Sequence, residues 1–286
     1  MRGNISHNQN ACRIPKIIHY CWFGGNAIPE KLQKCIDSWN RLEGYKLMRW
    51  DESNCSFEEN DFVIKTYQEK QLGYIGDYYR LKALYDYGGI YLDTDVKVNK
   101  SFDDLLHYKA FFNFIFDCSV GSAIIGAEAK NPLIKNLLDM YDATVFTKNA
   151  SEKVFEWSGD RLLVNSYATS NYYYTYYILK NYKSFRLNNR FQDLGDFVIF
   201  PKEYFEIGTL TSRHYAIHLC SGEWRIKADD TKSIKGYLKR VITKWPALFD
   251  KLQIIIRKHR YNKLKKDIPF YNCYLAQKEG REIPDL

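Results

Sequence analysis

The sequence lacks any long apolar run. No stretch approaches the 18 or more consecutive apolar residues of a membrane-spanning helix, and the amino terminus lacks the basic-then-apolar pattern of a signal sequence. There is also no internal repeat and no low-complexity tract. The 286 residues are 45% hydrophobic and 16% aromatic, enough for one large core or for one core with an appendage. We therefore expect a soluble protein located in the cytoplasm.

Paired cysteines are missing as well. The chain has seven cysteines, which are Cys12, Cys21, Cys35, Cys55, Cys118, Cys220 and Cys273. They are scattered and odd in number, and no Cys-x-x-Cys pair occurs among them. This pattern argues against a disulfide framework and against a structural zinc site, and it predicts reduced thiols, as found in a cytoplasm.

Residues 74–96 are the most informative segment of the chain. Apolar residues follow Asp77 at helical spacing, and Gly88-Gly89 supplies the positive-φ positions that end such a helix. Asp77 and Arg80 are three residues apart and share one helix face, so a carboxylate and a forked cation lie beside the same place.

A short buried strand is expected directly after the two glycines. Residues 90–92 form an apolar run of strand length, so Asp93 and Asp95 emerge where the strand leaves the core. Because alternate residues of an extended segment point the same way, both carboxylates can bind one Mn²⁺ or Mg²⁺ ion and leave positions open for phosphate oxygens. The segment predicts a nucleotide-sugar site. A solvated strand end beside a helix-face ion pair is the alternative.

These residues resemble the Asp-x-Asp sugar-binding region of glycosyltransferase family 32. Residues 14–25 (Ile-Pro-Lys-Ile-Ile-His-Tyr-Cys-Trp-Phe-Gly-Gly) resemble the first strand and nucleotide loop of that family, and residues 218–224 (His-Leu-Cys-Ser-Gly-Glu-Trp) resemble its C-terminal element. The family includes yeast mannosyltransferases and bacterial capsule and lipopolysaccharide transferases. The resemblance implies a GT-A fold, a metal-bound nucleotide sugar and a transferase that retains the anomeric configuration.

The wider pattern alternates strands and helices. Strands are expected at 16–20, 45–50, 90–92, 110–116, 122–126, 197–200 and 215–218, and helices at 29–39, 61–70, 133–141 and around Asp77. This alternation predicts an α/β fold, a Rossmann-like mixed sheet of GT-A type with flanking helices, most of its strands parallel and its ligands at their carboxyl ends. A composition shift near Trp224 divides the chain into a GT-A domain (1–224) and a basic helical C-terminal segment (225–286).

The resemblance also implies roles for individual residues. Asp77 would lie near the ribose and donor sugar, and Arg80 would reach the sugar or the diphosphate. Asp93 would contact ribose and metal, and Asp95 would be the principal metal ligand. His218 would complete the metal shell or act as a cation on the diphosphate, with a purely structural role as the alternative.

Aromatic residues follow the first strand, where a GT-A fold places the nucleobase. The candidates for contacts with base or ribose are His19, Tyr20, Trp22, Phe23, Trp50 and Asp51, and core packing is the alternative for the rings of Tyr20, Trp22 and Trp50. Such a pocket, together with the resemblance to bacterial transferases, implies a UDP-hexose donor, galactose first, in capsule or lipopolysaccharide synthesis, with GDP-mannose as the alternative.

Departures from the family pattern fall on the side of the donor sugar and acceptor. Ser158-Gly159-Asp160 stands where Ser-Gly-Pro is common, and Glu223 precedes Trp224 where the family usually has Ser. We nevertheless place Ser158, Gly159 and Trp224 among the sugar-binding candidates. Asp117 and Asp160 are the only candidates for a covalent nucleophile, and front-face attack without one is the alternative. A phosphatase and a non-catalytic glycan-binding module are disfavoured.

Basic residues are concentrated near the C-terminus. Residues 225–266 contain 14 Lys or Arg and 3 Asp or Glu, a balance of +11, so the rest of this +8 chain carries −3. Apolar residues recur there at helical spacing, and Pro246 predicts two helices or one kinked helix. A basic amphipathic helix is typical of contact with an anionic membrane surface and a lipid-linked saccharide acceptor. Packing on the main domain is the alternative, and nucleic acid is not favoured because no reading motif accompanies the charge.

Overall fold

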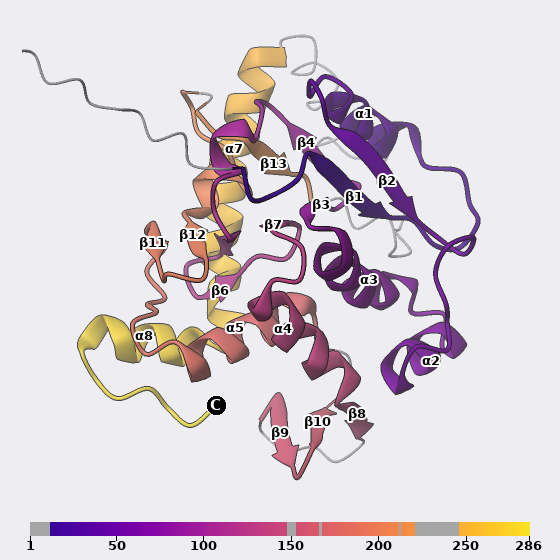
Figure 1. Ribbon diagram of the computed structural model, residues 1–286. Helices are drawn as coiled ribbons and strands as arrows, with labels where there is room; N and C mark the ends of the chain where they lie inside the picture. The colour runs from indigo at the N-terminus through magenta and orange to yellow at the C-terminus, as the bar shows by residue number, and fades with distance from the viewer. Residues whose placement is uncertain (1–11, 148–152, 166–167, 212, 221–245) are drawn as a thin grey trace, which may run out of the picture.

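The computed structural model describes residues 12–147, 153–165, 168–211, 213–220 and 246–286 (Figure 1). Its main sheet has the strand order β11-β12-β5-β7-β3-β1-β2, with β6 paired to β5. The strands are β1 (Ile17–Cys21), β2 (Lys46–Trp50), β3 (Gly89–Leu92), β5 (Ala110–Ile115), β6 (Ser119–Val120), β7 (Ile124–Ala127), β11 (Gln192–Asp193) and β12 (Val198–Phe200). The strands expected from the sequence and the helices expected at 29–39, 61–70 and 133–141 occur within two residues of these bounds, and a helix spans Asp77.

The sheet is mixed, as predicted, but its strands are not mostly parallel. β1 pairs in parallel with β2 and β3, and β12 with β5, whereas β7 runs antiparallel to both β3 and β5. β11 and β6 also pair antiparallel with their neighbours. The reversal follows from the connection after β3, which lacks the crossover helix that parallel neighbours need. The predicted α/β fold with a mixed sheet and flanking helices is confirmed, and its assignment to the GT-A type stays a prediction.

Helices cover both faces of this sheet. They are α1 (Glu30–Trp39), α2 (Asp61–Gln68), α3 (Leu72–Tyr87), α4 (Pro132–Asp142), α5 (Ser170–Asn181), α7 (Pro246–Leu264) and α8 (Tyr271–Glu279). Successive side chains of β3 point to opposite faces: Tyr91 joins a core cluster with residues of α3, α4, α5 and α8, and Ile90 joins a second cluster with residues of α1. β3 is therefore buried on both sides, and only its carboxyl end is available for a site.

Two small sheets accompany the main one. β4 (Val96–Val98) pairs antiparallel with β13 (Ala216–His218), and β8 (Thr144–Thr147), β10 (Arg161–Asn165) and β9 (Phe155–Ser158) form a three-stranded sheet. Figure 1 places the first beside the end of β3 and the second at the opposite end of the molecule. The described residues also include three 3₁₀ turns: η1 (Asp103–Leu105), η2 (Lys202–Tyr204) and η3 (Lys265–Asp267).

The two glycines between α3 and β3 are required by their surroundings. Gly88 has φ +64° and Gly89 has φ +114°, in the region that residues with a Cβ rarely adopt. A Cβ on Gly88 would lie 2.6 Å from the backbone nitrogen of Ala129, and a Cβ on Gly89 would lie 2.6 Å from the carbonyl oxygen of Ile17. Only glycine lets α3 end this close to the neighbouring strands and lets β3 begin at once.

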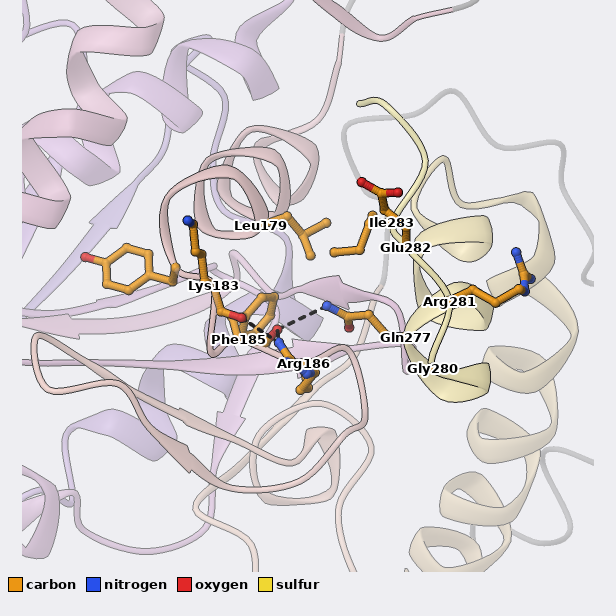
Figure 2. A pocket seen from close by; sticks show the side chains of 10 residues that line it. Leu179, Lys183, Phe185, Arg186, Gln277, Gly280, Arg281, Glu282 and Ile283 are labelled. Atoms are coloured by element: carbon orange, nitrogen blue, oxygen red, sulfur yellow. Dashed lines mark hydrogen bonds between the residues drawn. The ribbon is translucent and has the colours of Figure 1, made fainter.

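The C-terminal helices pack on the rest of the chain. Phe270 and Cys273 are buried in the same core cluster as α3 and α5, and Gln277 on α8 hydrogen-bonds the backbone of Phe185 and Leu187 (Figure 2). The predicted domain boundary at 224/225 lies outside the described residues and stays a prediction. The described part, 246–286, shares its core with the main fold. Among the described residues, no helix is long and apolar enough to cross a membrane.

Candidate functional site

The Asp93–Asp95 turn joins the main sheet to the small sheet of β4 and β13. The backbone N–H of Asp93 donates to the carbonyl oxygen of Ala123, and the N–H of Val96 donates to the carbonyl oxygen of Asp93, both at 2.9 Å. The carbonyl oxygen of Asp95 accepts the N–H of Leu219, also at 2.9 Å. Hydrogen bonds on both sides thus fix the backbone that carries the two carboxylates, so the site is built on a rigid turn.

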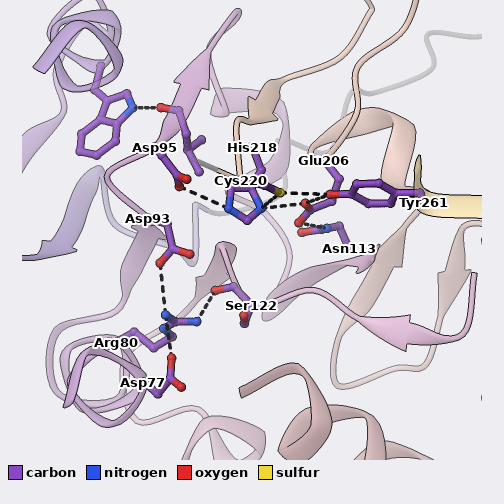
Figure 3. A network of polar contacts seen from close by, with 12 residues as sticks. Asp77, Arg80, Asp93, Asp95, Asn113, Ser122, Glu206, His218, Cys220 and Tyr261 are labelled. Atoms are coloured by element: carbon purple, nitrogen blue, oxygen red, sulfur yellow. Dashed lines mark hydrogen bonds and ion pairs between the residues drawn. The ribbon is translucent and has the colours of Figure 1, made fainter. Parts of the chain in front are cut away.

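Arg80 fixes the orientation of Asp93. Its Nη2 lies 2.9 Å from Oδ1 of Asp77 and 3.1 Å from Oδ1 of Asp93, and its Nη1 donates to the carbonyl oxygen of Ser122 at 2.9 Å (Figure 3). The guanidinium also lies 4.8 Å from the ring centre of Tyr91. Arg80 is buried, and its Nη2 alone bridges the two carboxylates while its Nη1 holds the backbone of Ser122. The predicted pairing of Asp77 with Arg80 is present, and direct contact of Arg80 with a diphosphate stays a prediction.

Asp77 is a buried carboxyl group in an unfavourable environment. Its side chain comes from the middle of α3 and is 8% exposed. Burial raises the pKa of Asp77 from its usual 3.8 to about 6, although Arg80 and Ser170 act in the opposite direction. Near pH 6 this residue therefore titrates beside the candidate site.

His218 reaches the site through the pairing of two distant segments. β13 pairs with β4 so that His218 lies opposite Val96, one residue beyond Asp95. Its Nε2 lies 3.3 Å from Oδ1 of Asp95, and its Nδ1 lies 2.9 Å from Oε2 of Glu206. Burial alone would lower the pKa of His218, but Cys220, Asp95 and Glu206 raise it well above its usual value.

The ligand atoms of Asp93, Asp95 and His218 fit a divalent cation. They lie within 4.8 Å of one another, and each residue is partly exposed. Among the described residues, one other set of possible metal ligands lies this close together: Glu206, His218 and Cys220. Two carboxylates with one imidazole suit Mn²⁺ better than Mg²⁺, because imidazole is a ligand of transition metals. The predicted ligand set is brought together by the fold.

Three of the predicted nucleobase residues lie at the carboxyl end of β1, on the same sheet edge as Asp93. Tyr20, Trp22 and Phe23 are half-buried. The ring of Tyr20 packs edge-on against Trp39, and Phe23 packs beside Phe57 and Tyr79. Base stacking by these rings stays a prediction. Asp51, at the end of β2, is bound to Arg49 and Ser53.

His19 and Trp50 do not face the site, which corrects their assignment to nucleotide binding. The side chain of His19 is 0% exposed, and its Nε2 donates to the carbonyl oxygen of Gly88 at 2.8 Å. Its Nδ1 accepts the indole N–H of Trp50 at 3.2 Å. Burial lowers the pKa of His19 to about 4, so the ring is neutral. The physical reason is that both side chains point into the core, where they hold the Gly88 turn in place.

The turn of Ser158, Gly159 and Asp160 is not brought to the site. Ser158, Gly159 and Asp160 are exposed in the β9–β10 hairpin, where Gly159 supplies φ +63°, and this hairpin lies far from β4 and β13 in Figure 1. Asp117 is held by the ammonium groups of Lys202 and Lys265. Burial raises the pKa of Asp117, but the two lysines lower it by more, so the pKa lies below its usual value. Trp224 lies outside the described residues.

Three residues around His218 were missed in the sequence. They are Asn113, Glu206 and Tyr261, from β5, the segment after η2 and α7. None of the three lies within a recognisable sequence motif. Only the pairing of β13 with β4 brings them together, so sequence reasoning had no pattern with which to find them.

A separate cavity of about 580 Å³ lies between α5 and α8. Figure 2 shows its lining, which includes Leu179, Lys183, Arg186, Gln277 and Ile283. Arg186 donates to the backbone carbonyls of Lys183 and Phe185 and so is already used within the protein. This cavity contains none of the predicted site residues.

The family comparison agrees with the motif. Residues 29–112 match the model of the glycosyltransferase sugar-binding region containing a DXD motif, a segment that runs from α1 to β5 and includes Asp77, Arg80, Asp93 and Asp95. This segment is therefore similar to the sugar-binding region of glycosyltransferases that contain a DXD motif, the region that the sequence pattern predicted.

Curated relatives include yeast mannosyltransferases. Inositol phosphoceramide mannosyltransferase 3 of Schizosaccharomyces pombe is 36% identical over 138 residues, 46% of this chain and 37% of the relative. Mannosyl phosphorylinositol ceramide synthase CSH1 of Saccharomyces cerevisiae is 30% identical over 44% of this chain and 34% of its own length. An uncharacterized glycosyltransferase of Acanthamoeba polyphaga mimivirus is 29% identical over 50% of this chain and 63% of its own length. The chain thus spans about a third to two thirds of these relatives.

Among solved structures, the chain is similar to the PaToxG glycosyltransferase. It is 21% identical, with a TM-score of 0.38 over 44% of this chain and 59% of that chain. At this score the two folds are not equated, and the fold assignment rests on the strand order given above.

Proposed function

We propose that this chain is a metal-dependent glycosyltransferase that transfers mannose from GDP-mannose to a saccharide or lipid-linked acceptor and retains the anomeric configuration. The observation that carries the proposal is the convergence of Asp93, Asp95 and His218 at the end of β3, within 4.8 Å of one another. A divalent cation held there would offset the negative charge that grows on the diphosphate as the glycosyl bond breaks.

The protein groups around the cation site act by orientation. Arg80 ties Asp93 to Asp77, so the carboxylate enters the site in one direction. The backbone hydrogen bond from Leu219 to Asp95 fixes the second carboxylate relative to His218. Preorganised ligands of this kind need no rearrangement when charge develops. Since Asp117 is engaged by two lysines and Asp160 lies far from the site, attack on the front face without a protein nucleophile is the mechanism we propose for retention.

Two observations favour mannose over the UDP-hexose expected from the sequence. The names of the yeast relatives concern mannosyl transfer. The expectation of UDP rested on an aromatic base pocket, and His19 and Trp50, two members of that pocket, are buried in the core. The alternative donor named in the sequence analysis, GDP-mannose, is therefore the better supported one.

Thermal shift with nucleoside diphosphates tests the donor. We expect GDP to raise the melting temperature more than UDP in the presence of Mn²⁺, and EDTA to remove the effect, because a ligand at 100 times its Kd stabilises by about 2.7 kcal/mol. Hydrolysis of GDP-mannose and UDP-galactose, followed by NMR of the anomeric proton, then tests sugar and stereochemistry. Stabilisation by UDP alone would overturn the choice of donor. No response to either nucleotide with Mn²⁺ would overturn the proposed activity.

We also propose that α7 contacts an anionic membrane surface from the cytoplasmic side. Residues 251–266 contain seven Lys or Arg and no Asp or Glu. Ile255 and Ile256 are 56% and 50% exposed, and Ile256 shares a helix face with Arg260 and Lys263. Exposed apolar side chains beside cations are typical of a helix that lies on anionic lipid, where each cation contributes about 1 kcal/mol.

Vesicle co-sedimentation tests this contact. We expect binding that rises with the fraction of anionic lipid, falls with added salt and weakens when Ile255 and Ile256 are both changed to Ser. Leu210→Ser is the matched control, because Leu210 is a 54% exposed apolar residue elsewhere in the protein. If anionic and zwitterionic vesicles give the same result at low salt, the membrane proposal is wrong and the acceptor is soluble.

A further inference from the structure

Glu206 is a fully buried carboxylate that neither motif nor family model includes. Its side chain is 0% exposed, and both of its oxygens are used. Oε1 accepts from Nδ2 of Asn113 at 3.1 Å, and Oε2 accepts from the hydroxyl of Tyr261 at 3.2 Å and lies 2.9 Å from Nδ1 of His218 (Figure 3). A buried carboxylate with this many partners is held in one orientation, since leaving it unpaired would be costly.

The contact with Glu206 decides which nitrogen of His218 is available. Because a carboxylate only accepts, Nδ1 of His218 must carry the hydrogen in this contact. The other nitrogen, Nε2, lies 3.3 Å from Oδ1 of Asp95 and is the nitrogen that a cation at the site would bind in place of its hydrogen. Histidines that bind metals almost always donate their second N–H to a carboxylate or carbonyl, which fixes the tautomer and the orientation of the ring.

The surroundings of Glu206 leave it little freedom to move. Asn113 lies on β5, and a Cβ added to Gly121 would approach Nδ2 of Asn113 to 2.6 Å and Oε1 of Glu206 to 3.1 Å. Tyr261 is buried on α7, with its ring 4.8 Å from that of Phe116. Elements from both halves of the chain thus close around this one carboxylate.

We propose that Glu206, held by Asn113 and Tyr261, is a positioning residue that presents Nε2 of His218 to the cation site. Tyr261 makes the basic helix α7 part of that support, so the C-terminal helix helps to order the ligands of the cation. The proposal rests on the proposed function, because it assigns a role relative to the Asp93–Asp95–His218 site.

Glu206→Gln is the decisive variant. The Gln side chain keeps the shape, but its amide nitrogen can donate to Nδ1, which moves the hydrogen to Nε2 and directs it at the cation site. We expect Mn²⁺ affinity, measured by calorimetry and by electron paramagnetic resonance of free Mn²⁺, to fall roughly tenfold to a hundredfold. Nitrogen-15 NMR of His218 in metal-free protein, at a pH high enough for the ring to be neutral, should report the changed tautomer.

A double-mutant comparison shows whether Glu206 acts through His218. In a His218→Ala background, Glu206→Gln should cause no further loss of Mn²⁺ affinity, whereas independent residues would give additive losses. Glu203→Gln is the matched control, because Glu203 lies nearby on η2 and is partly exposed. If Glu206→Gln does not fold, Tyr261→Phe removes one hydroxyl and should give a smaller loss of Mn²⁺ affinity with the fold intact.

The outcomes separate this inference from the proposed function. If Glu206→Gln and Tyr261→Phe bind Mn²⁺ as tightly as the wild type, the inference is wrong and the proposed function still stands. Additive losses in the double mutant would also overturn it. A wild-type protein that binds no Mn²⁺ would overturn both.

Discussion

Replacing Asp77 by Asn should stabilise the protein at alkaline pH while removing its activity. Asp77 is buried, and its pKa is raised to about 6 by that burial, with Arg80 2.9 Å away opposing the change. The ionised form is therefore disfavoured in the folded protein relative to the unfolded chain, where the usual value is 3.8. Asn has the shape of the protonated carboxyl group and carries no charge to bury.

The expected magnitude follows from the two pKa values. The difference between about 6 and 3.8 corresponds to about 3 kcal/mol of unfolding free energy. Between these values the folded protein holds more protons than the unfolded chain, so this contribution makes stability fall as pH rises, and the full loss is present above pH 6. Asp77→Asn should then be up to about 3 kcal/mol more stable than wild type at pH 8 and no more stable at pH 4.

His19 acts in the opposite direction over nearly the same range. Burial lowers its pKa from 6.5 to about 4, so its contribution to stability is present above pH 6.5 and is lost as pH falls towards 4, again by about 3 kcal/mol. In the wild type, the opposite effects of Asp77 and His19 on the pH dependence of stability largely cancel. Asp77→Asn removes the effect of Asp77, so the stability of the variant should fall steeply below pH 6.5.

Urea denaturation in EDTA at constant ionic strength, from pH 4 to pH 8, measures these slopes. Asp86→Asn is the matched control: Asp86 lies on the same helix, is half-exposed and pairs with Lys82 and Lys130, so its loss should change stability by less than about 1 kcal/mol without altering the slope. A variant at Asp77 that is less stable than wild type at pH 8, or that keeps the wild-type pH profile, would refute the reasoning.

The other predictions concern the cation site and its support. Arg80→Lys should fold and lower Mn²⁺ affinity and kcat roughly tenfold to a hundredfold, because one ammonium group cannot reproduce a planar fork that contacts Asp77 and Asp93 through Nη2 and the Ser122 carbonyl through Nη1; near-normal values would show that these contacts are dispensable. Asp95→Ala should fold and lose the Mn²⁺-dependent thermal shift with GDP, and an unchanged shift would contradict its assignment as a ligand. Gly126→Ala should destabilise by about 1–3 kcal/mol in urea, since a Cβ there would lie 2.0 Å from Cε1 of Phe111, and a neutral result would mean that this ring can move aside.

The local part of the site could be predicted from the sequence because its determinants are local. The helix of Asp77 and Arg80, the glycine turn and the strand that leads to Asp93 follow one another within about twenty residues, and each has its own pattern. Because these elements are joined by short connections, they must lie close together, and ion pairs between Arg80 and nearby carboxylates could be predicted.

The direction in which strand residues point was not predictable in the same way. β1 is flanked by strands on both sides and covered on both faces, so its aromatic and polar residues look alike in the sequence whether they face a ligand or the core. The sequence therefore predicts a nucleotide contact for His19, whereas in the structure this residue supports the Gly88 turn. Glu206 and Tyr261 were missed for a different reason: they meet His218 only through contacts between distant segments, and no local pattern records such contacts.

The order of the site residues along the chain has a consequence for biosynthesis. A nascent chain presents Asp93 and Asp95 early, while His218, Glu206 and Tyr261 emerge from the ribosome later. At ordinary translation rates the stretch from Asp95 to Tyr261 takes on the order of 10 to 30 s. During that interval the first strands can pair, but the histidine and its supporting carboxylate and hydroxyl do not yet exist. The cation site that we propose would thus be completed late in synthesis, and a chain released before residue 261 would possess the Asp93–Asp95 turn without the hydroxyl of Tyr261 that supports Glu206.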